Sequence, residues 1–145
     1  SVKVAYRCAK STFENDPPNY YIVYSNGDIL MEVFEAGSID RIYLNFSDPW
    51  PKPSHYKRRL THKNFLDVYK TVLSKNGEIH MKTDNNDLFE YSLEQFEKDN
   101  WKFIMVTRDL HNSIYKEDNI MTEYEERFAN EGKKINKLIV RKKNG

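Results

Sequence analysis

The sequence predicts an α/β protein built on a mostly parallel sheet. Through the first hundred residues, segments with helical periodicity alternate with short runs rich in β-forming residues. This alternation is typical of a parallel sheet covered by helices. The 145 residues suffice for a single domain, residues 1–145, whose core needs neither a disulfide nor a metal.

The amino-terminal part predicts two helices separated by a strand. Residues 1–13 place apolar side chains on one helical face, and residues 16–18 (Asp-Pro-Pro) end that helix. Residues 20–25 are short and rich in β-forming side chains, so they predict a strand with a turn at Asn26-Gly27. Residues 28–35 follow as a short helix with Asp28 as a plausible cap.

The middle of the chain predicts a strand, a helix and a second strand. Residues 41–46 form an apolar run of the kind that fills a buried strand. Thr61 is expected to cap the next helix, which Asn76-Gly77 would stop, and residues 78–83 predict the following strand. The side chains expected to face inward from that helix are Phe65, Tyr69, Val72 and Leu73.

The last third predicts one more helix and two strands. The helix after Asp84 should turn four apolar side chains toward the core, namely Leu88, Phe89, Leu93 and Phe96. Strands are expected at residues 102–108 and 134–142, separated by a polar loop and a short helix or turn at residues 122–130. Because no full helix separates these two strands, they should form an antiparallel hairpin.

Residues 45–59 hold the densest set of candidate functional side chains. Three prolines there fix φ and remove backbone donors, so the strand 41–46 must end in a stiff loop. Asp48 lies at the carboxyl end of that strand, where open α/β sheets bind ligands, and Trp50 follows it. The cations between Asp48 and the next acid, Asp67, are Lys52, Lys57, Arg58, Arg59 and Lys63.

This order of residues predicts a site for an anionic polymer that carries flat rings. Trp50 and Tyr56 can stack on bases, and the cations can neutralise phosphates. A stiff loop also holds Asp48 with little conformational entropy left to lose, as a catalytic group requires. The alternatives are a solvated charged surface and a simple proline connector.

Three motifs in order resemble those of the bacterial tRNA (guanine-N7)-methyltransferases. They are residues 45–52 (Asn-Phe-Ser-Asp-Pro-Trp-Pro-Lys), residues 77–85 and residues 119–125. The resemblance implies an S-adenosylmethionine-dependent methyltransferase (Rossmann-like) fold, whose last strand is antiparallel. It also implies S-adenosylmethionine as cofactor and tRNA as partner, with methyl transfer to N7 of a guanine in the variable loop.

The resemblance also assigns roles to individual residues. Asp48 would be catalytic and cofactor-facing, and Asn26 would contact the cofactor, although the family usually has Asp there and Asp28 could serve instead. The implied substrate-binding residues are Lys52, Asp84, Thr122, Glu123, Tyr124 and Glu125. The implied RNA-binding residues are Ser54, His55, Tyr56, Lys57, Arg58 and Arg59. Helix capping is the competing explanation for Asp84 and for the Thr-x-x-Glu at residues 122–125.

The glycines do not supply the cofactor loop that such methyltransferases carry after their first strand. No Gly-x-Gly occurs among the five glycines, Gly27, Gly37, Gly77, Gly132 and Gly145. We therefore expect the glycine-loop portion to lie upstream, and this chain to be a partial methyltransferase domain, the carboxyl-terminal two-thirds of a longer protein that is inactive alone.

The composition limits the functions and kinds of site that this protein can have. The net charge of +1 means that an affinity for RNA must come from local clustering of cations. The single cysteine, Cys8, excludes an internal disulfide, and the four histidines lack metal-ligand spacing, so no metal site is expected. No signal peptide or apolar span is present, which predicts a cytoplasmic protein without a membrane partner.

The sequence is also compatible with two other functions and with a homodimer. A methyltransferase acting on an exocyclic amine could use a similar proline-aromatic turn, and a non-catalytic RNA-binding α/β module would need no glycine loop. Unpaired strand edges would also allow a homodimer.

Overall fold

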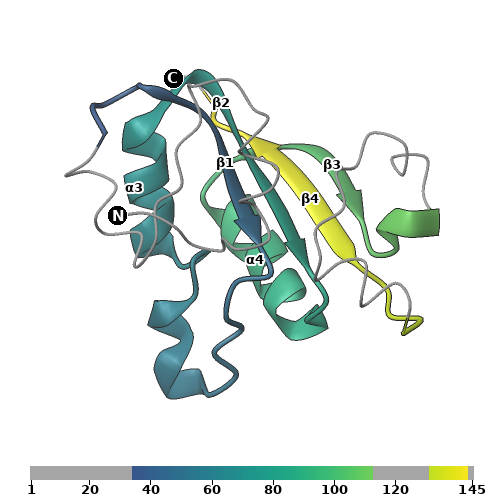
Figure 1. Cartoon of the computed structure of the whole chain (residues 1–145). Helices are drawn as coiled ribbons and strands as arrows, with labels where there is room; N and C mark the ends of the chain where they lie inside the picture. Colours follow the sequence, from purple (N-terminus) through teal and green to yellow (C-terminus); the bar gives the residue numbers. More distant parts are fainter. Residues whose placement is uncertain (1–33, 113–130, 144–145) are drawn as a thin grey trace.

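The computed structural model describes residues 34–112 and 131–143, and its order of elements agrees with the α/β prediction. Strand β1 (Ile39–Asn45) leads through the 3-10 helix η2 (Pro53–Arg58) to helix α3 (Lys63–Val72). Strand β2 (Leu73–Thr83), helix α4 (Asn86–Lys98) and strand β3 (Lys102–Thr107) follow. A 3-10 turn, η3 (Leu110–Asn112), and strand β4 (Asn136–Arg141) complete the described chain (Figure 1). The elements predicted within residues 1–25 and 122–130 lie outside the described residues. Of the helix predicted at residues 28–35, only Phe34 and Glu35 are described, and neither is helical.

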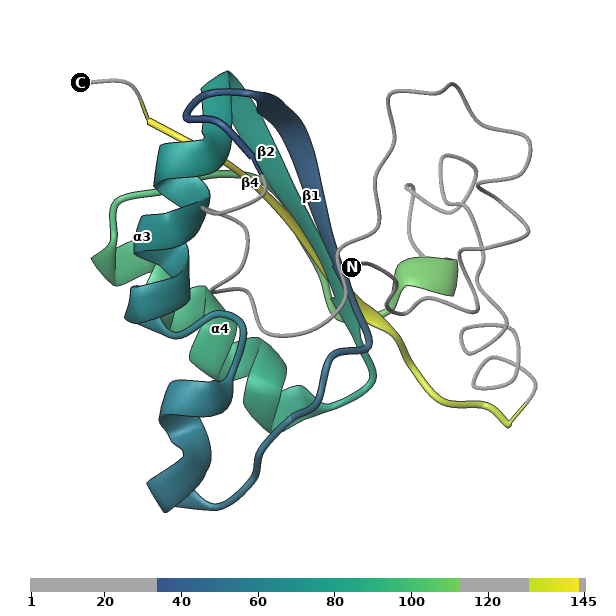
Figure 2. The ribbon, with the colours of Figure 1, turned by 60° about the vertical axis from the view of Figure 1, so that its left-hand side comes forward.

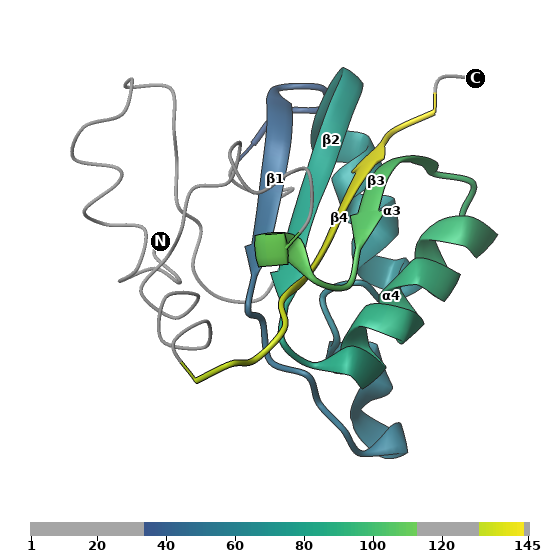
Figure 3. The same cartoon turned by 90° about the vertical axis from the view of Figure 1, so that its right-hand side faces the viewer.

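The four strands form a mixed sheet in the order β1-β2-β4-β3 (Figure 3). Strand β2 pairs parallel with β1, whereas β4 is antiparallel to both β2 and β3. The antiparallel last strand and its pairing with the preceding strand are confirmed. Strand β4 lies between β2 and β3, so β3 runs in the same direction as β1 and β2.

Both helices pack on one face of the sheet (Figure 2). The predicted inward residues of α3, Phe65, Tyr69 and Val72, are buried in the core. From α4, Leu88, Phe89 and Phe96 are buried, and Leu93 is partly buried against them. The spacing of apolar residues therefore identified the faces of both helices correctly.

Helix α3 ends earlier than predicted. It stops at Val72, and Leu73 already belongs to β2, where it pairs with Ile39 of β1. The register then shifts, so that the next pair is Arg41 with Glu78. Gly77 is thus required inside the strand and does not stop the helix, because a Cβ there would lie 2.8 Å from the Leu73 side chain.

The cap of α3 also differs from the prediction. His62 is the N-cap, and its Nδ1 accepts a hydrogen bond from the Asn64 backbone N–H at 3.1 Å. Thr61 is buried and its hydroxyl lies 2.7 Å from the Ser92 hydroxyl on α4. The hydroxyl of Thr61 therefore joins the two helices instead of capping one.

Candidate active site

The candidate site lies at one end of the sheet. Because β1, β2 and β3 run in the same direction, their carboxyl ends meet at this end, and β4 begins there. Asp48 follows β1, Asp84 follows β2 and Arg108 follows β3. Helix η2 extends beyond the end of β1 (Figures 1 and 3). The strands thus bring Asp48, Asp84 and the cationic segment to the same side of the molecule.

The loop after β1 has an unusual backbone. Phe46 has φ 55° and Trp50 has φ 42°, both in the left-handed region that bulky side chains rarely adopt. Each such residue costs about 1–3 kcal/mol and persists only where the surroundings determine it. One of those determinants is the Phe46 backbone N–H, which donates to the Lys82 carbonyl at 2.8 Å. The loop is therefore held in a conformation that its sequence would not adopt by itself.

Asp48 lies between these two residues and is exposed to solvent. Within residues 34–112 and 131–143 its carboxylate makes no hydrogen bond or ion pair. A carboxylate that only capped its own loop would make such a bond. An exposed carboxylate on a restrained loop is instead free to meet a ligand.

The predicted RNA-binding residues occupy η2 and differ in exposure. Ser54, Lys57 and Arg58 are exposed, as is Lys52 just before the helix, whereas His55 and Tyr56 are partly buried. Two of the six contact the tryptophan of the loop: the His55 ring meets the Trp50 ring edge-on, with centroids 5.6 Å apart. The Arg58 guanidinium lies 5.0 Å from the Trp50 centroid.

Arg59 does not share that exposure, with only 3% of its surface accessible. Its guanidinium lies 4.1 Å from the Tyr56 ring centroid and 4.6 Å from that of Tyr91 on α4. Its Nε donates to the Pro49 carbonyl at 2.8 Å. Burial raises the pKa of the Tyr91 hydroxyl, and the Arg59 charge opposes that rise. We therefore separate Arg59 from the RNA-binding set, because a phosphate could not reach it.

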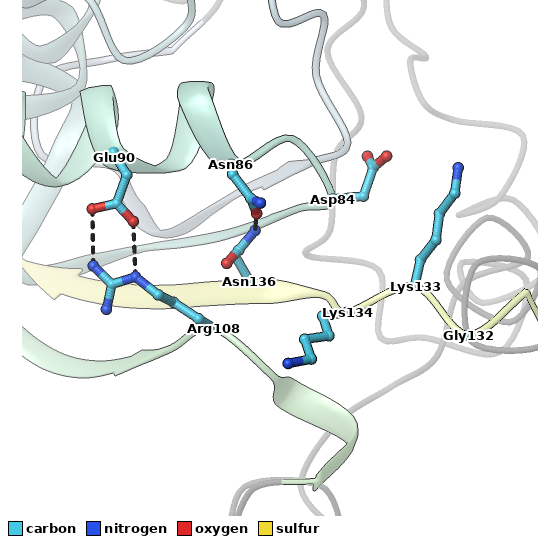
Figure 4. A pocket seen from close by; sticks show the side chains of 8 residues that line it. All are labelled: Asp84, Asn86, Glu90, Arg108, Gly132, Lys133, Lys134 and Asn136. Atoms are coloured by element: carbon cyan, nitrogen blue, oxygen red, sulfur yellow. Dashed lines mark hydrogen bonds and ion pairs between the residues drawn. The ribbon is translucent and has the colours of Figure 1, made fainter.

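Asp84 lines an open pocket of about 730 Å³ at the ends of β2, β3 and β4. The helix-capping explanation for Asp84 is wrong, since Asn85 caps α4 by accepting from the Leu88 N–H at 2.8 Å. Figure 4 shows Asp84 at the end of β2, with Lys133 and Lys134 nearby on the segment before β4. Seven of the eight residues that line this pocket are polar or charged.

The walls of this pocket are held by two sets of hydrogen bonds (Figure 4). Asn136, 2% exposed, donates to the Thr83 carbonyl at 3.1 Å and to the Asn86 Oδ1 at 3.0 Å. The Arg108 guanidinium donates twice to Glu90, at 2.8 and 2.9 Å, and this bond lowers the pKa of the Glu90 carboxyl. Both sets join the start of α4 to the strands beneath it.

The residues at the end of β1 suit a cofactor that carries an ammonium group. Asn45 is the last residue of β1, and its buried Oδ1 has no hydrogen-bond partner within the described chain. Asp48, three residues on, offers a carboxylate with no partner there either. Unpaired acceptors are what the amino-acid end of S-adenosylmethionine would meet, so these residues fit the group.

Several predicted residues cannot be placed. Asn26, Asp28 and residues 122–125 lie outside the described residues. In the described ranges, no cluster of three or more His, Cys, Asp or Glu could hold a metal ion. No helix there is long and apolar enough to cross a membrane.

The fold and this arrangement define an α/β protein with a candidate ligand site at its strand ends, and comparison with known proteins identifies the family. Residues 1–138 match the family model described as "Putative methyltransferase", so the chain belongs to that methyltransferase family. It is 50% identical over 138 residues to the tRNA (guanine-N(7)-)-methyltransferase of Macrococcus caseolyticus (strain JCSC5402), covering 95% of this chain and 65% of that protein.

A second relative and a solved structure are also similar. The chain is 54% identical over 120 residues to the tRNA (guanine-N(7)-)-methyltransferase of Streptococcus sanguinis (strain SK36), covering 83% of this chain and 56% of that protein. It therefore spans 56–65% of the length of these two relatives. A SAM-dependent methyltransferase from Archaeoglobus fulgidus aligns over 93% of this chain and 73% of that one, with a TM-score of 0.47 and 12% identity.

Sequence reasoning missed the side chains that support the site. Asn136 was detectable, because it lies between the apolar residues Ile135 and Leu138, and an amide that is buried with them must find partners. The partnership of Arg59 with Tyr91 carried no local signal, since the two lie on separate elements. Asn85 could have been predicted as the cap of α4 from the sequence, because Asn is as common an N-cap residue as Asp.

Proposed function

We propose that this chain, as part of its whole protein, catalyses methyl transfer from S-adenosylmethionine to N7 of a guanine in tRNA. The observation that carries the proposal is Asp48, an exposed carboxylate without a described partner, held beside a cationic and aromatic segment at the carboxyl end of β1. The names of the two relatives support the same reaction and substrate.

Asp48 would act on charge and orientation, not as a strong base. Guanine N7 already has an in-plane lone pair, so the attack on the methyl group requires no proton removal. Methylation leaves positive charge on the imidazole ring, and a fixed carboxylate stabilises that charge as it forms. The bound S-adenosylmethionine supplies the methyl group. The same carboxylate, together with the Asn45 Oδ1, can accept from the cofactor's ammonium group.

The other residues would bind and orient the RNA. Lys52, Lys57 and Arg58 are exposed cations suited to neutralise phosphates. Asp84, which lines the same pocket as Lys133 and Lys134, can accept from the N–H groups of guanine. We extend the proposal to residues 122–125 as further substrate contacts and to Asn26 or Asp28 as the adenine contact. Ser54, His55 and Tyr56 complete the proposed RNA surface.

The test is product analysis with the full-length protein. A tRNA transcript and S-adenosylmethionine should yield 7-methylguanine at one variable-loop position, identified by nuclease digestion and mass spectrometry. Methylation of an exocyclic amine would replace the proposal with the second class of methyltransferase. Binding of tRNA without any methylated product, by protein that also binds S-adenosylmethionine, would favour a non-catalytic RNA-binding module.

Two further proposals concern where the protein acts in the cell and its oligomeric state. We place the activity in the cytoplasm because the proposed substrate is tRNA. Within the described chain β1 pairs only with β2, so its other edge could also join a second copy. Sedimentation of the full-length protein would separate a monomer from a homodimer.

A further inference from the structure

Arg59 is a buried cation with an uncommon set of neighbours. Its guanidinium lies over the rings of both Tyr56 and Tyr91, whose centroids are 5.7 Å apart. Its one side-chain hydrogen bond to the described residues runs from Nε to the Pro49 carbonyl at 2.8 Å. None of the described carboxylates forms an ion pair with it. Within the described residues, the charge is therefore balanced only by two rings and a carbonyl.

Stability alone does not explain an arginine at this position. A buried charge is costly to desolvate, and an apolar side chain of similar volume is often equally stable in its place. What arginine adds is a planar group that stacks on aromatic rings and still directs an N–H at a chosen acceptor. That acceptor is the carbonyl of the residue next to Asp48.

The bond from Arg59 anchors the far end of the restrained loop. At the near end, the Phe46 N–H donates to the Lys82 carbonyl at 2.8 Å. At the far end, the Pro49 carbonyl belongs to the peptide that enters Trp50, whose φ is 42°. Asp48 lies between these two anchors and has no bond of its own to the described residues. The direction of its carboxylate thus depends on both anchors.

We propose that Arg59 is a positioning residue for Asp48. Its guanidinium is held by η2 and α4, so its hydrogen bond to the Pro49 carbonyl fixes the catalytic loop relative to these two helices. The inference rests on the proposed function. Tyr91 anchors the guanidinium from α4, and Tyr56 anchors it from η2. Removal of the Nε–H would let the loop relax from its left-handed residues and displace the carboxylate.

The first test compares two matched substitutions in the full-length protein. Arg59→Met keeps an unbranched side chain but removes the charge and the donor, and should lower kcat about 10- to 100-fold with little change in the KM for tRNA. The control is Arg141→Met, which removes an arginine bonded to Glu78 at the other end of the sheet. The control should lower the melting temperature while the folded protein keeps its kcat. A folded Arg59→Met protein with the wild-type kcat would overturn the inference.

A double-mutant cycle tests whether Arg59 acts through Asp48. In an Asp48→Asn background, Arg59→Met should lower kcat by less than about twofold further, because the group that it positions has already been deprived of its charge. Multiplicative losses in the double variant would show that Arg59 acts independently of Asp48, and would also overturn the inference.

A third readout does not depend on methylation. Backbone amides in residues 46–60 should exchange with deuterium faster in Arg59→Met than in the wild type, and unchanged exchange would mean that Arg59 does not restrain the loop. If the wild-type protein makes no 7-methylguanine, the proposed function fails, and exchange still decides whether Arg59 holds the loop.

Discussion

Strands β1 and β2, which pair in parallel, are each followed by an aspartate, and the two segments that carry these aspartates are held in different ways. After β2, the chain enters a helix at once: the Asn85 side chain caps α4, and Asn136 of β4 bonds to the Thr83 carbonyl. After β1, the prolines prevent a helix from starting, and Arg59, ten residues further on, holds the loop through the Pro49 carbonyl.

This difference is consistent with the different roles that we propose for the two aspartates. Asp84 is partly buried and lines a pocket large enough for a nucleotide, which suits the proposed binding role. Asp48 is exposed and stands between two residues with positive φ. Strain of this kind collects where a group must be held ready for a reaction.

The largest effect should come from removing the charge of Asp48. Asp48→Asn in the full-length protein should lower kcat roughly a hundred- to thousandfold, the usual cost of removing one preorganised electrostatic interaction. The melting temperature should stay near that of the wild type, because the carboxylate has no partner in the described chain. A normal kcat in the folded variant would remove Asp48 from the reaction.

At the end of β2, the main effect should fall on stability. Asn136→Ala leaves the Thr83 carbonyl and the Asn86 amide without their buried donor, which should cost about 1–3 kcal/mol in the free energy of unfolding. Chemical denaturation of the full-length protein measures this cost. Asn86→Ala, the control, removes only one of the two bonds and should cost less; equal costs would contradict the assignment.

The cap of α4 should contribute less than the buried amide. Asn85→Ala removes the acceptor for the Leu88 N–H and should cost about 1 kcal/mol of unfolding free energy. Asn85→Asp keeps the acceptor and should restore most of that stability in the same denaturation experiment. If Asp fails to restore it, the side chain contributes something other than a cap.

The smallest effect should appear in the salt dependence of tRNA binding. Lys57→Ala with Arg58→Ala should reduce the slope of log affinity against log salt by about 0.7 to 0.9 for each phosphate that is no longer neutralised. The matched control removes the same charge from exposed lysines at the other end of the sheet, Lys75→Ala with Lys102→Ala. Equal slopes for the two double variants would make η2 ordinary solvated surface.

Part of this contrast could be predicted from the sequence. The alternation of helical and β-forming segments located the four described strands and the helices α3 and α4, and three prolines predicted a stiff loop carrying Asp48. The 3-10 helices η2 and η3 were not predicted. The end of α3 could not be predicted, because the pairing of Leu73 with Ile39 across the sheet overrides the local turn signal at Asn76-Gly77. Local propensity is a weak prior when tertiary pairing competes with it.

The candidate site shows the same division between local and distant causes. A cluster of adjacent cations suggested one RNA surface, yet Arg59 turns inward whereas Lys57 and Arg58 stay exposed. Exposure at neighbouring positions depends on which partner the fold brings close. Here that partner is Tyr91, 32 positions further along the chain, the difference between 91 and 59.

The most direct test measures single-turnover methylation by Asp48→Asn and Asp84→Asn in the full-length protein. Rates would be followed as tRNA is raised to saturation, with S-adenosylmethionine in excess. We expect Asp84→Asn to need more tRNA but to approach the wild-type rate at saturation. We expect Asp48→Asn to bind tRNA nearly normally and to stay slow at every concentration. Equal reductions in the two saturated rates would contradict the division between a binding and a catalytic aspartate.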